Sequence, residues 1–283
     1  MHRYELSQAQ WDLIKGLVPG PKSTGRPPRD ARQLFNGMLW ILHTGAPWRD
    51  LPRDLYGPWS TVYDHFRAWR MDGTFDRILE QLRIRLDRQG RIDWDVWMID
   101  STMIRAGRPA SGAKKGGPGE PADHALGRSR GGFGTKLHLV SDRHGIPLAR
   151  LATPGQRGES LYVGTLVDSV RIPQESGPPR RRPRLLIADK GYDHPTVRQA
   201  LRARHIRALI PRRNDPRLHR RGRPPFFDRE LYRGRNAVER LVGNLKERRR
   251  LATRFEKFAV SYETLVSLAF MELYLEGAFP YRA

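Results

Sequence analysis

Apolar residues recur at helical spacing through the first third of the chain. Four stretches carry this pattern, at residues 7–18, 31–45, 59–70 and 74–86, and segments rich in Pro, Gly and charge separate them. The first stretch starts with Ser7 and Gln10, a pair that forms a capping box at a helix N-terminus. The pattern predicts a small all-α domain over residues 1–90.

From about residue 91 short apolar runs alternate with helical ones. Strands are predicted at residues 95–102, 135–142, 147–153, 185–189 and 206–211, and helices at residues 158–170, 194–204, 229–250 and 261–275. Three strands come first, and helices and strands then alternate. This order predicts an α/β domain over residues 91–283, with a ribonuclease H-like mixed sheet and flanking helices. Residues 106–132 are rich in Gly, Pro and charge and predict a mobile basic loop.

The charge of the chain indicates a polyanionic partner. The net charge is +22 and the pI is about 11.1, which favours nucleic acid because phosphate contacts release counterions. A membrane surface fits less well, since the basic residues are spread along the chain. The absence of cysteine excludes disulfides and thiolate sites, and the first residues lack the apolar segment of a signal peptide. We therefore expect a cytoplasmic protein without a membrane partner.

The N-terminal helices resemble a helix-turn-helix DNA-binding unit in number, length and basic surface. The candidate recognition helix covers residues 60–70, where Arg67 and Arg70 are expected to face outward and contact DNA. The alternative is a small helical domain that serves only packing or dimerisation.

Two acids are predicted to end apolar strands: Asp100 follows "VWMI" and Asp189 follows "LLIA". Catalytic groups gather at such strand ends, although an Asp there can also simply form a turn. A third acid, Glu239, lies within the predicted helix at residues 229–250. Two strand-end carboxylates and a helical one suit Mg²⁺ or Mn²⁺. The alternative for Glu239 is a helical ion pair with Arg235, four residues before it.

These residues carry a resemblance to a known family. "IDST" with Asp100, "DKGY" with Asp189, and Tyr232, Arg235, Glu239 and Lys246 in the spacing Y-x2-R-x3-E-x6-K resemble the DDE transposases of bacterial insertion sequences in the IS4/IS5 superfamily. "NGMLWILHTGAPWRDLP" and "GRSRGGFGTKLHLVSDRHGIPLA" resemble the IS5 branch, and the resemblance covers nearly the whole chain.

The resemblance implies the chemistry. Such enzymes cleave phosphodiester bonds at transposon ends and join the 3′-OH ends to target DNA by in-line transfer, with two Mg²⁺ or Mn²⁺ ions. The three acids would be both catalytic residues and metal ligands. Double-stranded DNA, as inverted-repeat ends and target, would be the partner of a homodimer or larger assembly in the bacterial cytoplasm and nucleoid. The alternatives are an inactive transposase that only binds DNA, and a related metal-dependent nuclease.

The resemblance also implies that Arg235 and Lys246 contact DNA phosphates and that Tyr232 packs against a DNA end. Residues 202–250 hold 17 basic and five acidic residues, so the positive charge is concentrated around Glu239. Within them "RGRPP" resembles the core of a minor-groove-binding hook, but the match is only four residues, so a generic basic loop is favoured. Further DNA contacts are expected from Arg221, Arg223, Arg248, Arg249 and Lys136.

Overall fold

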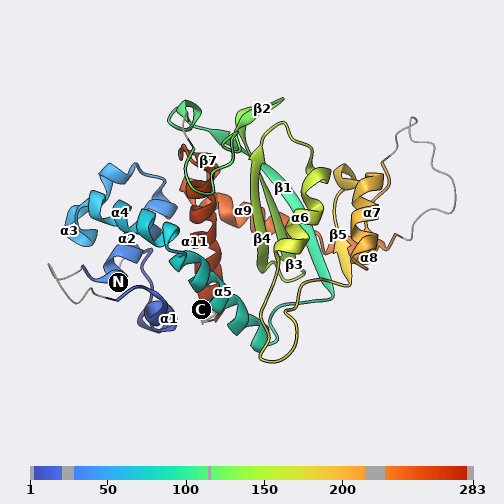
Figure 1. Cartoon of the computed structure of the whole chain (residues 1–283), viewed down its shortest axis with the longest axis horizontal. Helices are drawn as coiled ribbons and strands as arrows, with labels where there is room; N and C mark the ends of the chain where they lie inside the picture. The colour runs from blue at the N-terminus through green and yellow to red at the C-terminus, as the bar shows by residue number, and fades with distance from the viewer. Residues whose placement is uncertain (1–2, 21–28, 114–115, 214–226, 279–283) are drawn as a thin grey trace. The chain divides into compact units, whose positions relative to one another are not determined.

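The structure is a computed structural model that describes residues 3–20, 29–113, 116–213 and 227–278. Its contacts divide the chain into two compact units (Figure 1). The first unit comprises Met1–Leu86, Arg105–His124 and Asn244–Ala283, and the second comprises Asp87–Ile104 and Ala125–Gly243. The unit that holds the N-terminal helices thus also includes the C-terminal helix. The boundary between residues 90 and 91 stays a prediction.

The first unit is helical. Its elements are α1 (Gln8–Ile14), α2 (Ala31–Thr44), α3 (Arg53–Tyr56), α4 (Trp59–Met71), α5 (Thr74–Arg88), α10 (Arg249–Ala252), β7 (Thr253–Arg254) and α11 (Ala259–Ala278). The predicted capping box forms at α1. Gly45 ends α2 in the left-handed region (φ 71°), and a Cβ there would lie 2.9 Å from Cβ of Arg249. Glycine is therefore required where α10 crosses the end of α2.

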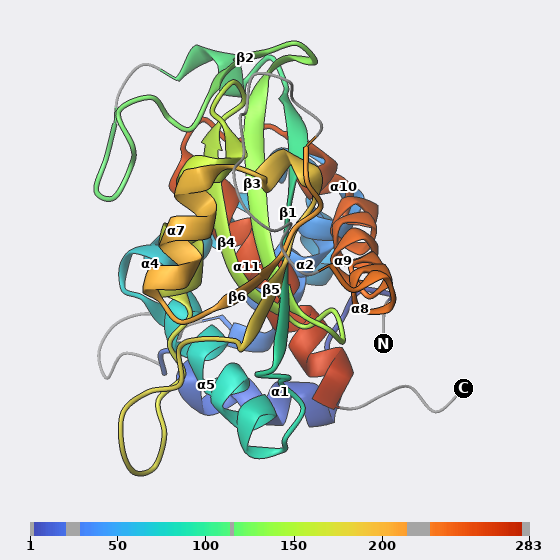
Figure 2. The ribbon, with the colours of Figure 1, turned by 90° about the vertical axis from the view of Figure 1, so that its right-hand side faces the viewer.

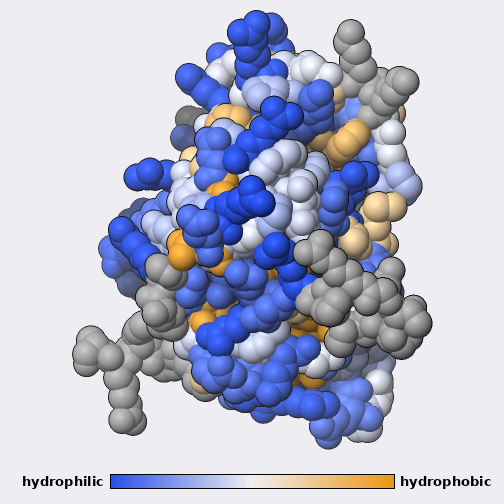
Figure 3. Space-filling model, turned by 90° about the vertical axis from the view of Figure 1, so that its left-hand side faces the viewer, coloured by the Kyte–Doolittle hydropathy of each residue, from blue (hydrophilic) through white to orange (hydrophobic). Residues whose placement is uncertain are grey.

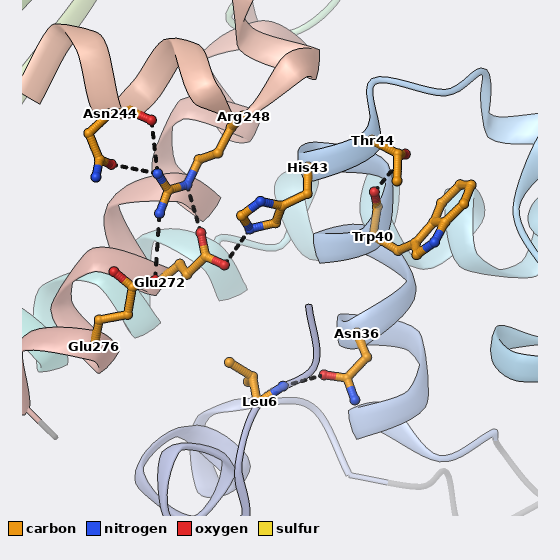
Figure 4. A network of polar contacts seen from close by, with 9 residues as sticks. All are labelled: Leu6, Asn36, Trp40, His43, Thr44, Asn244, Arg248, Glu272 and Glu276. Atoms are coloured by element: carbon orange, nitrogen blue, oxygen red, sulfur yellow. Dashed lines mark hydrogen bonds and ion pairs between the residues drawn. The ribbon is translucent and has the colours of Figure 1, made fainter. Parts of the chain in front are cut away.

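A buried polar network ties α2 to α11 within this unit (Figure 4). The Arg248 guanidinium pairs with the Glu272 carboxylate at 2.6 Å, and the His43 ring lies 2.5 Å from the other oxygen of that carboxylate. Arg248 also donates to the backbone carbonyl of Asn244 at 3.0 Å. Burial opposes ionisation of Glu272, but His43 and Arg248 hold the pKa of its carboxyl below the usual value. The charges are thus paired where water does not reach them.

One residue of the segment predicted as a mobile loop contacts a distant helix. The Glu120 carboxylate accepts hydrogen bonds from the backbone N–H groups of Ala259 and Val260, at 2.7 and 3.1 Å. These groups open α11, and helix N-terminal N–H groups have no partner within their own helix. Glu120 therefore caps a helix that lies far along the chain, which no local pattern at residue 120 could show.

The second unit is built on a mixed sheet. The strand order is β2-β3-β1-β5-β6, and β4 pairs with the other edge of β3. β3 runs antiparallel to β2 and β4, whereas β5 runs parallel to β1 and β6. The strands are β1 (Val96–Ala106), β2 (Gly127–Ser129), β3 (Gly132–Asp142), β4 (Pro147–Pro154), β5 (Leu185–Ile187) and β6 (Arg207–Leu209). The predicted ribonuclease H-like mixed sheet is confirmed.

Helices cover both faces of this sheet. They are α6 (Val163–Ser169), α7 (Pro195–Ala203), α8 (Arg229–Arg233) and α9 (Asn236–Glu247), and Figure 2 shows α7 and α9 on opposite sides of the strands. Ala237 and Val238 of α9 pack on Met98, Ile187 and Leu209, one from each of three neighbouring strands. This apolar contact is what holds α9 against the sheet.

Two predicted boundaries were wrong, and both concern candidate site residues. Asp100 does not end its strand, because β1 continues to Ala106 and its last two residues pair with β7. The helix predicted at residues 229–250 is three helices, since α8 ends at Arg233 and α9 ends at Glu247. A Cβ at Gly234 would lie 3.0 Å from the Leu231 carbonyl oxygen and 3.3 Å from Cε of Met98. A side chain at this position would therefore crowd the Leu231 carbonyl and the end of the Met98 side chain.

The hydrophilic surface agrees with the highly charged composition of the chain. Hydrophilic residues cover most of the face drawn in Figure 3, which carries α3 and α4, and hydrophobic residues there are scattered. Among the described residues, no helix has both the length and the apolar character needed to cross a membrane.

A buried histidine makes the second unit sensitive to acid. His138 of β3 is fully buried, its Nε2 lies 2.9 Å from Oγ1 of Thr153, and burial lowers the pKa of the ring to about 4. The unfolded chain, with a His pKa of about 6.5, binds more protons between these values. Stability should therefore fall as the pH drops from about 6.5 to about 4, by roughly 3 kcal/mol from this group alone.

Urea unfolding at pH 7 and pH 4.5 tests this expectation. The His138→Gln variant serves as the reference, because it cannot titrate at this position. Wild type should lose more stability than the variant on acidification. Equal losses in the two proteins would show that His138 is not the group responsible.

Candidate active site

The strand register brings the two predicted aspartates to one place. Met98 of β1 is level with Ile187 of β5, so Asp100 and Asp189 each lie two residues further along adjacent parallel strands. Asp189 follows the end of β5, and its Oδ1 accepts a hydrogen bond from the Gly191 backbone N–H at 2.8 Å. Because side chains two residues apart share a face, Asp100 projects on the same side of β1 as Met98, toward α9.

Arg235 forms ion pairs with both Asp100 and Glu239. It lies between α8 and α9, and its guanidinium contacts the Asp100 carboxylate at 3.0 Å and also pairs with the Glu239 carboxylate. The Arg235 and Asp100 side chains are 14% and 18% exposed, whereas that of Glu239 is 52% exposed. The helical ion pair weighed from the sequence does form, but it is part of a three-residue bridge to the sheet.

The electrostatics of the site reflect this crowding of charge. Burial raises the pKa of the Asp100 carboxyl, and the neighbouring Asp189 carboxylate adds to the rise, although Arg235 opposes it. Burial alone would lower the pKa of Arg235, but Asp100 and Glu239 raise it above its usual value. The site therefore combines carboxylates that repel one another with a cation that holds two of them.

Tyr232 flanks these acids from α8. Its ring packs against the core formed by β1, β5, β6 and α9, and lies 5.1 Å from the ring of Phe227. Burial raises the pKa of its phenol. Because α8 and α9 are separate helices, Tyr232 reaches this position through the break at Gly234 rather than along one straight helix.

A fourth acid near Asp189 was missed by the sequence reasoning. Glu159 begins the short 3-10 helix η4 (Glu159–Tyr162), and its Oε1 accepts a hydrogen bond from Oγ of Ser101 at 2.7 Å. A Cβ at Gly191 would lie 2.9 Å from Oδ1 of Asp189 and 3.3 Å from Oε2 of Glu159. The available signal was that Glu159 is the one acid between Asp142 and Asp168 in the sequence.

The predicted DNA contacts fall in different environments. Arg67, Lys246 and Arg249 are exposed, and Lys136 is paired with Glu159 at 3.3 Å. Arg70 does not face outward freely, since it is half-buried and donates to Oγ of Ser261 at 3.3 Å. Arg221 and Arg223 lie outside the described residues.

Arg248 requires a correction. It was expected to contact DNA, but it is only 4% exposed and its guanidinium is held by the Glu272 carboxylate. Its charge is already matched inside the first unit, so Arg248 is a structural ion-pair partner there.

Two further acids outside the motif positions have structural partners. Oδ1 of Asp142 accepts hydrogen bonds from the backbone N–H groups of His144 and Ile146, at 2.9 and 2.8 Å, in the turn between β3 and β4. Asp193 pairs with Arg198 at 2.9 Å and accepts from the Arg213 backbone N–H. These carboxylates stabilise turns and loops.

Comparison with known proteins places the chain in a family. Residues 95–271 match the family described as "Transposase DDE domain", and residues 6–79 match "Putative transposase of IS4/5 family". The first match alone covers well over half of the chain. The chain therefore belongs to the DDE transposases, and the N-terminal match makes it one of the IS4/5 type. The finer assignment to the IS5 branch stays a prediction.

Individual relatives agree. The chain is 36% identical over 164 residues to a putative transposase of insertion sequence element IS402 from Burkholderia cepacia, covering 58% of this chain and 66% of that protein. It is 30% identical over 141 residues to a putative transposase of IS6501 from Brucella ovis, covering 50% of this chain and 98% of that protein. The catalytic domain of Mos1 mariner transposase is similar with 12% identity and a TM-score of 0.26, over 62% of this chain and 90% of that domain.

DDE transposases use divalent metal ions, and the chemistry of this site fits one. Carboxylate oxygens are the preferred ligands of Mg²⁺ and Mn²⁺, and Asp100 and Asp189 lie side by side. Among the described residues, no three Asp, Glu or His side chains are gathered closely enough to hold an ion. Glu239 is instead held by Arg235, which also pairs with Asp100.

Proposed function

We propose that this transposase cleaves DNA at the ends of its insertion sequence and joins the freed 3′-OH ends to target DNA. Asp100, Asp189 and Glu239 are the proposed catalytic residues and metal ligands. The convergence of Asp100, Arg235 and Glu239 beside Asp189, in a chain of this family, is the observation that carries the proposal. Residues 1–90 are proposed to bind DNA and residues 91–283 to carry the chemistry. The net charge of +22 supports a DNA partner.

The chain's own residues have distinct proposed roles. Bound Mg²⁺, proposed as two ions, would neutralise charge at phosphorus and lower the pKa of an attacking hydroxyl. Asp100 and Asp189 are held on a rigid sheet, which fixes the position of the reacting phosphate. Arg235 is proposed to leave the carboxylates and pair with a DNA phosphate, because guanidinium binds both groups in the same planar geometry. Tyr232 and Lys246 are proposed to contact the DNA end. A dimer or larger assembly would hold two ends together.

Mg²⁺ should stabilise the folded protein through this site in the absence of DNA. A ligand that binds only the folded state at 100 times its Kd adds about 2.7 kcal/mol of stability. We therefore expect the thermal midpoint to rise with Mg²⁺ concentration in wild type and to remain constant in an Asp100→Asn/Asp189→Asn variant. An equal rise in both proteins would place the bound metal elsewhere.

A plasmid assay separates the proposed function from its alternatives. One supercoiled plasmid carries the inverted-repeat ends of the element, and a matched plasmid lacks them. A transposase in Mg²⁺ cuts only the first plasmid, at the ends. A general nuclease of the same fold cuts both plasmids, and an inactive DNA-binding protein cuts neither, so either of these results would contradict the proposal.

A further inference from the structure

A pocket of about 560 Å³ opens beside the proposed active site, within the second unit. Its volume is within the range of about 300–1,000 Å³ that is typical of small-ligand sites. Several polar and charged side chains line it: Ser101, Arg128, Arg130, Lys136, Gln156 and Glu159. Ser101 follows Asp100 in β1 and points to the opposite face of that strand. Glu159 accepts a hydrogen bond from Ser101, and a Cβ at Gly191 would lie within 3.3 Å of both the Glu159 and the Asp189 carboxylates. The pocket therefore borders the proposed active site at Asp189, through Glu159.

The pocket is positively charged. Arg128 lies on β2 and Arg130 in the turn that joins β2 to β3, and both guanidinium groups are exposed. Neither has a hydrogen-bond or ion-pair partner within the described ranges of the chain. Lys136 of β3 is the third cation, and Glu159 is the single acid in the lining. Three positive charges thus face one negative charge in a concave site, which favours an anionic ligand.

Two glycines lie at the pocket: Gly155 lines it, and Gly127 directly precedes the lining residue Arg128. A Cβ at Gly155 would lie 2.8 Å from Cε of Met103 and 3.0 Å from the Gly127 carbonyl oxygen. A Cβ at Gly127 would overlap the Gln156 side chain. A side chain at Gly155 would crowd the backbone of the neighbouring strands, and one at Gly127 would displace the Gln156 side chain. The absence of side chains at both positions lets a ligand approach the backbone closely.

Of the three cations that line the pocket, Lys136 is the one that pairs with Glu159. Glu159 holds Lys136 at 3.3 Å, and Lys136 also donates to the Arg157 carbonyl at 3.0 Å. Arg128 and Arg130 have no such restraint. A bound anion would therefore meet the two arginines first, and Glu159 would repel it from Lys136 and from the neighbouring Asp189.

We infer that this pocket binds the sugar-phosphate backbone of the DNA strand next to the scissile phosphate. Arg128 and Arg130 pair with its phosphates, and Glu159 sets the border between these phosphates and the catalytic acids. This inference rests on the proposed function, because it takes the ligand to be the DNA on which the transposase acts.

Salt dependence of DNA binding provides the first test. The full chain is titrated with a fluorescent duplex in EDTA, so that no cleavage occurs. Each phosphate paired with Lys or Arg adds about 0.9 to the slope of log K against log salt concentration. Arg128→Gln and Arg130→Gln should each lower that slope by about 0.9, whereas the control Arg181→Gln, in the exposed loop before β5, should lower it less. Equal slopes for Arg128→Gln, Arg130→Gln and wild type would overturn the inference.

The Glu159→Gln variant gives a change of opposite sign. It frees Lys136 and removes the one negative charge, so DNA binding should become tighter and its salt slope steeper. Weaker binding by Glu159→Gln would overturn the role given to Glu159. Inorganic phosphate at constant ionic strength should not displace the duplex, and displacement would identify a small-anion site instead.

Protection of an introduced thiol locates the DNA. The chain has no cysteine, so Gln156→Cys places a single reactive thiol in the pocket and Ser176→Cys places one in the loop before β5. DNA should slow maleimide labelling of the first variant and not of the second. Equal rates with and without DNA at Cys-substituted Gln156 would overturn the inference. Neither measurement needs catalysis, so an inactive protein that shows protection would refute the proposed function and leave the pocket assignment standing.

Discussion

Asp100→Asn, Asp189→Asn and Glu239→Gln should each lower the rate of DNA-end cleavage in Mg²⁺ by at least about 10³-fold. A metal ion supplies several kcal/mol of transition-state stabilisation in phosphoryl transfer, and each 1.36 kcal/mol corresponds to a factor of ten. The amide variants keep the size of the side chain and remove the charge that is proposed to hold the metal. DNA binding measured without metal should remain, because these carboxylates repel phosphate rather than attract it.

Glu230→Gln is the matched control for this series. Glu230 lies on α8, close in sequence to Glu239, and its exposed carboxylate pairs with Arg233 on the same short helix. Its loss should leave cleavage within about twofold, since exposed ion pairs contribute about 0–1 kcal/mol. Wild-type activity in Glu239→Gln would show that the carboxylate bridged to Asp100 through Arg235 is a structural group only.

Arg248→Met should destabilise the first unit by about 3–5 kcal/mol, because it leaves the Glu272 carboxylate buried with one partner fewer. Urea unfolding followed by circular dichroism measures this loss. Arg249→Met is the control, since Arg249 is exposed and substitutions at such positions change stability by about 0.5 kcal/mol or less. The two arginines are adjacent in sequence and differ only in their environment.

The same pair of variants discriminates between the two roles considered for Arg248. If Arg248 contacts DNA, Arg248→Met weakens DNA binding and leaves the unfolding midpoint unchanged. If Arg248 instead forms the buried ion pair, Arg248→Met lowers the unfolding midpoint and leaves DNA binding unchanged. The double variant Arg248→Met/Glu272→Leu should recover part of the lost stability, because it removes both charges instead of leaving one unpaired.

The sequence predicted most of the sheet because its strands are continuous apolar runs bounded by turns. The positions of β3, β4, β5 and β6 follow this rule closely, and the strand order and directions follow from the alternation of elements. The length of β1 could not be predicted in this way. Its second half, from Ser101 onward, is polar on one face because it borders the pocket, and its final residues depend on pairing with β7, almost 150 residues away.

The sequence predicted which residues form the site better than it predicted how those residues are arranged. The spacing of Tyr232, Arg235, Glu239 and Lys246 identified the residues, but a straight helix was assumed, whereas α8 ends at Arg233 and α9 begins at Asn236. Glu159 carried no motif. The role of Arg248 depended on Glu272, an acid within a strongly apolar helix. Such an acid needs a buried partner, and that signal was available in the sequence.

The proposed joining of insertion-sequence ends to new DNA can be measured with the purified chain, Mg²⁺, pre-cleaved duplex ends bearing 3′-OH groups and a target plasmid, followed by sequencing of the junctions. We expect covalent junctions between the 3′-OH ends and the target in wild type, and none in Asp189→Asn. Wild-type protein that binds the ends but forms no junction, or an Asp189→Asn variant that forms them at the wild-type rate, would contradict this proposal.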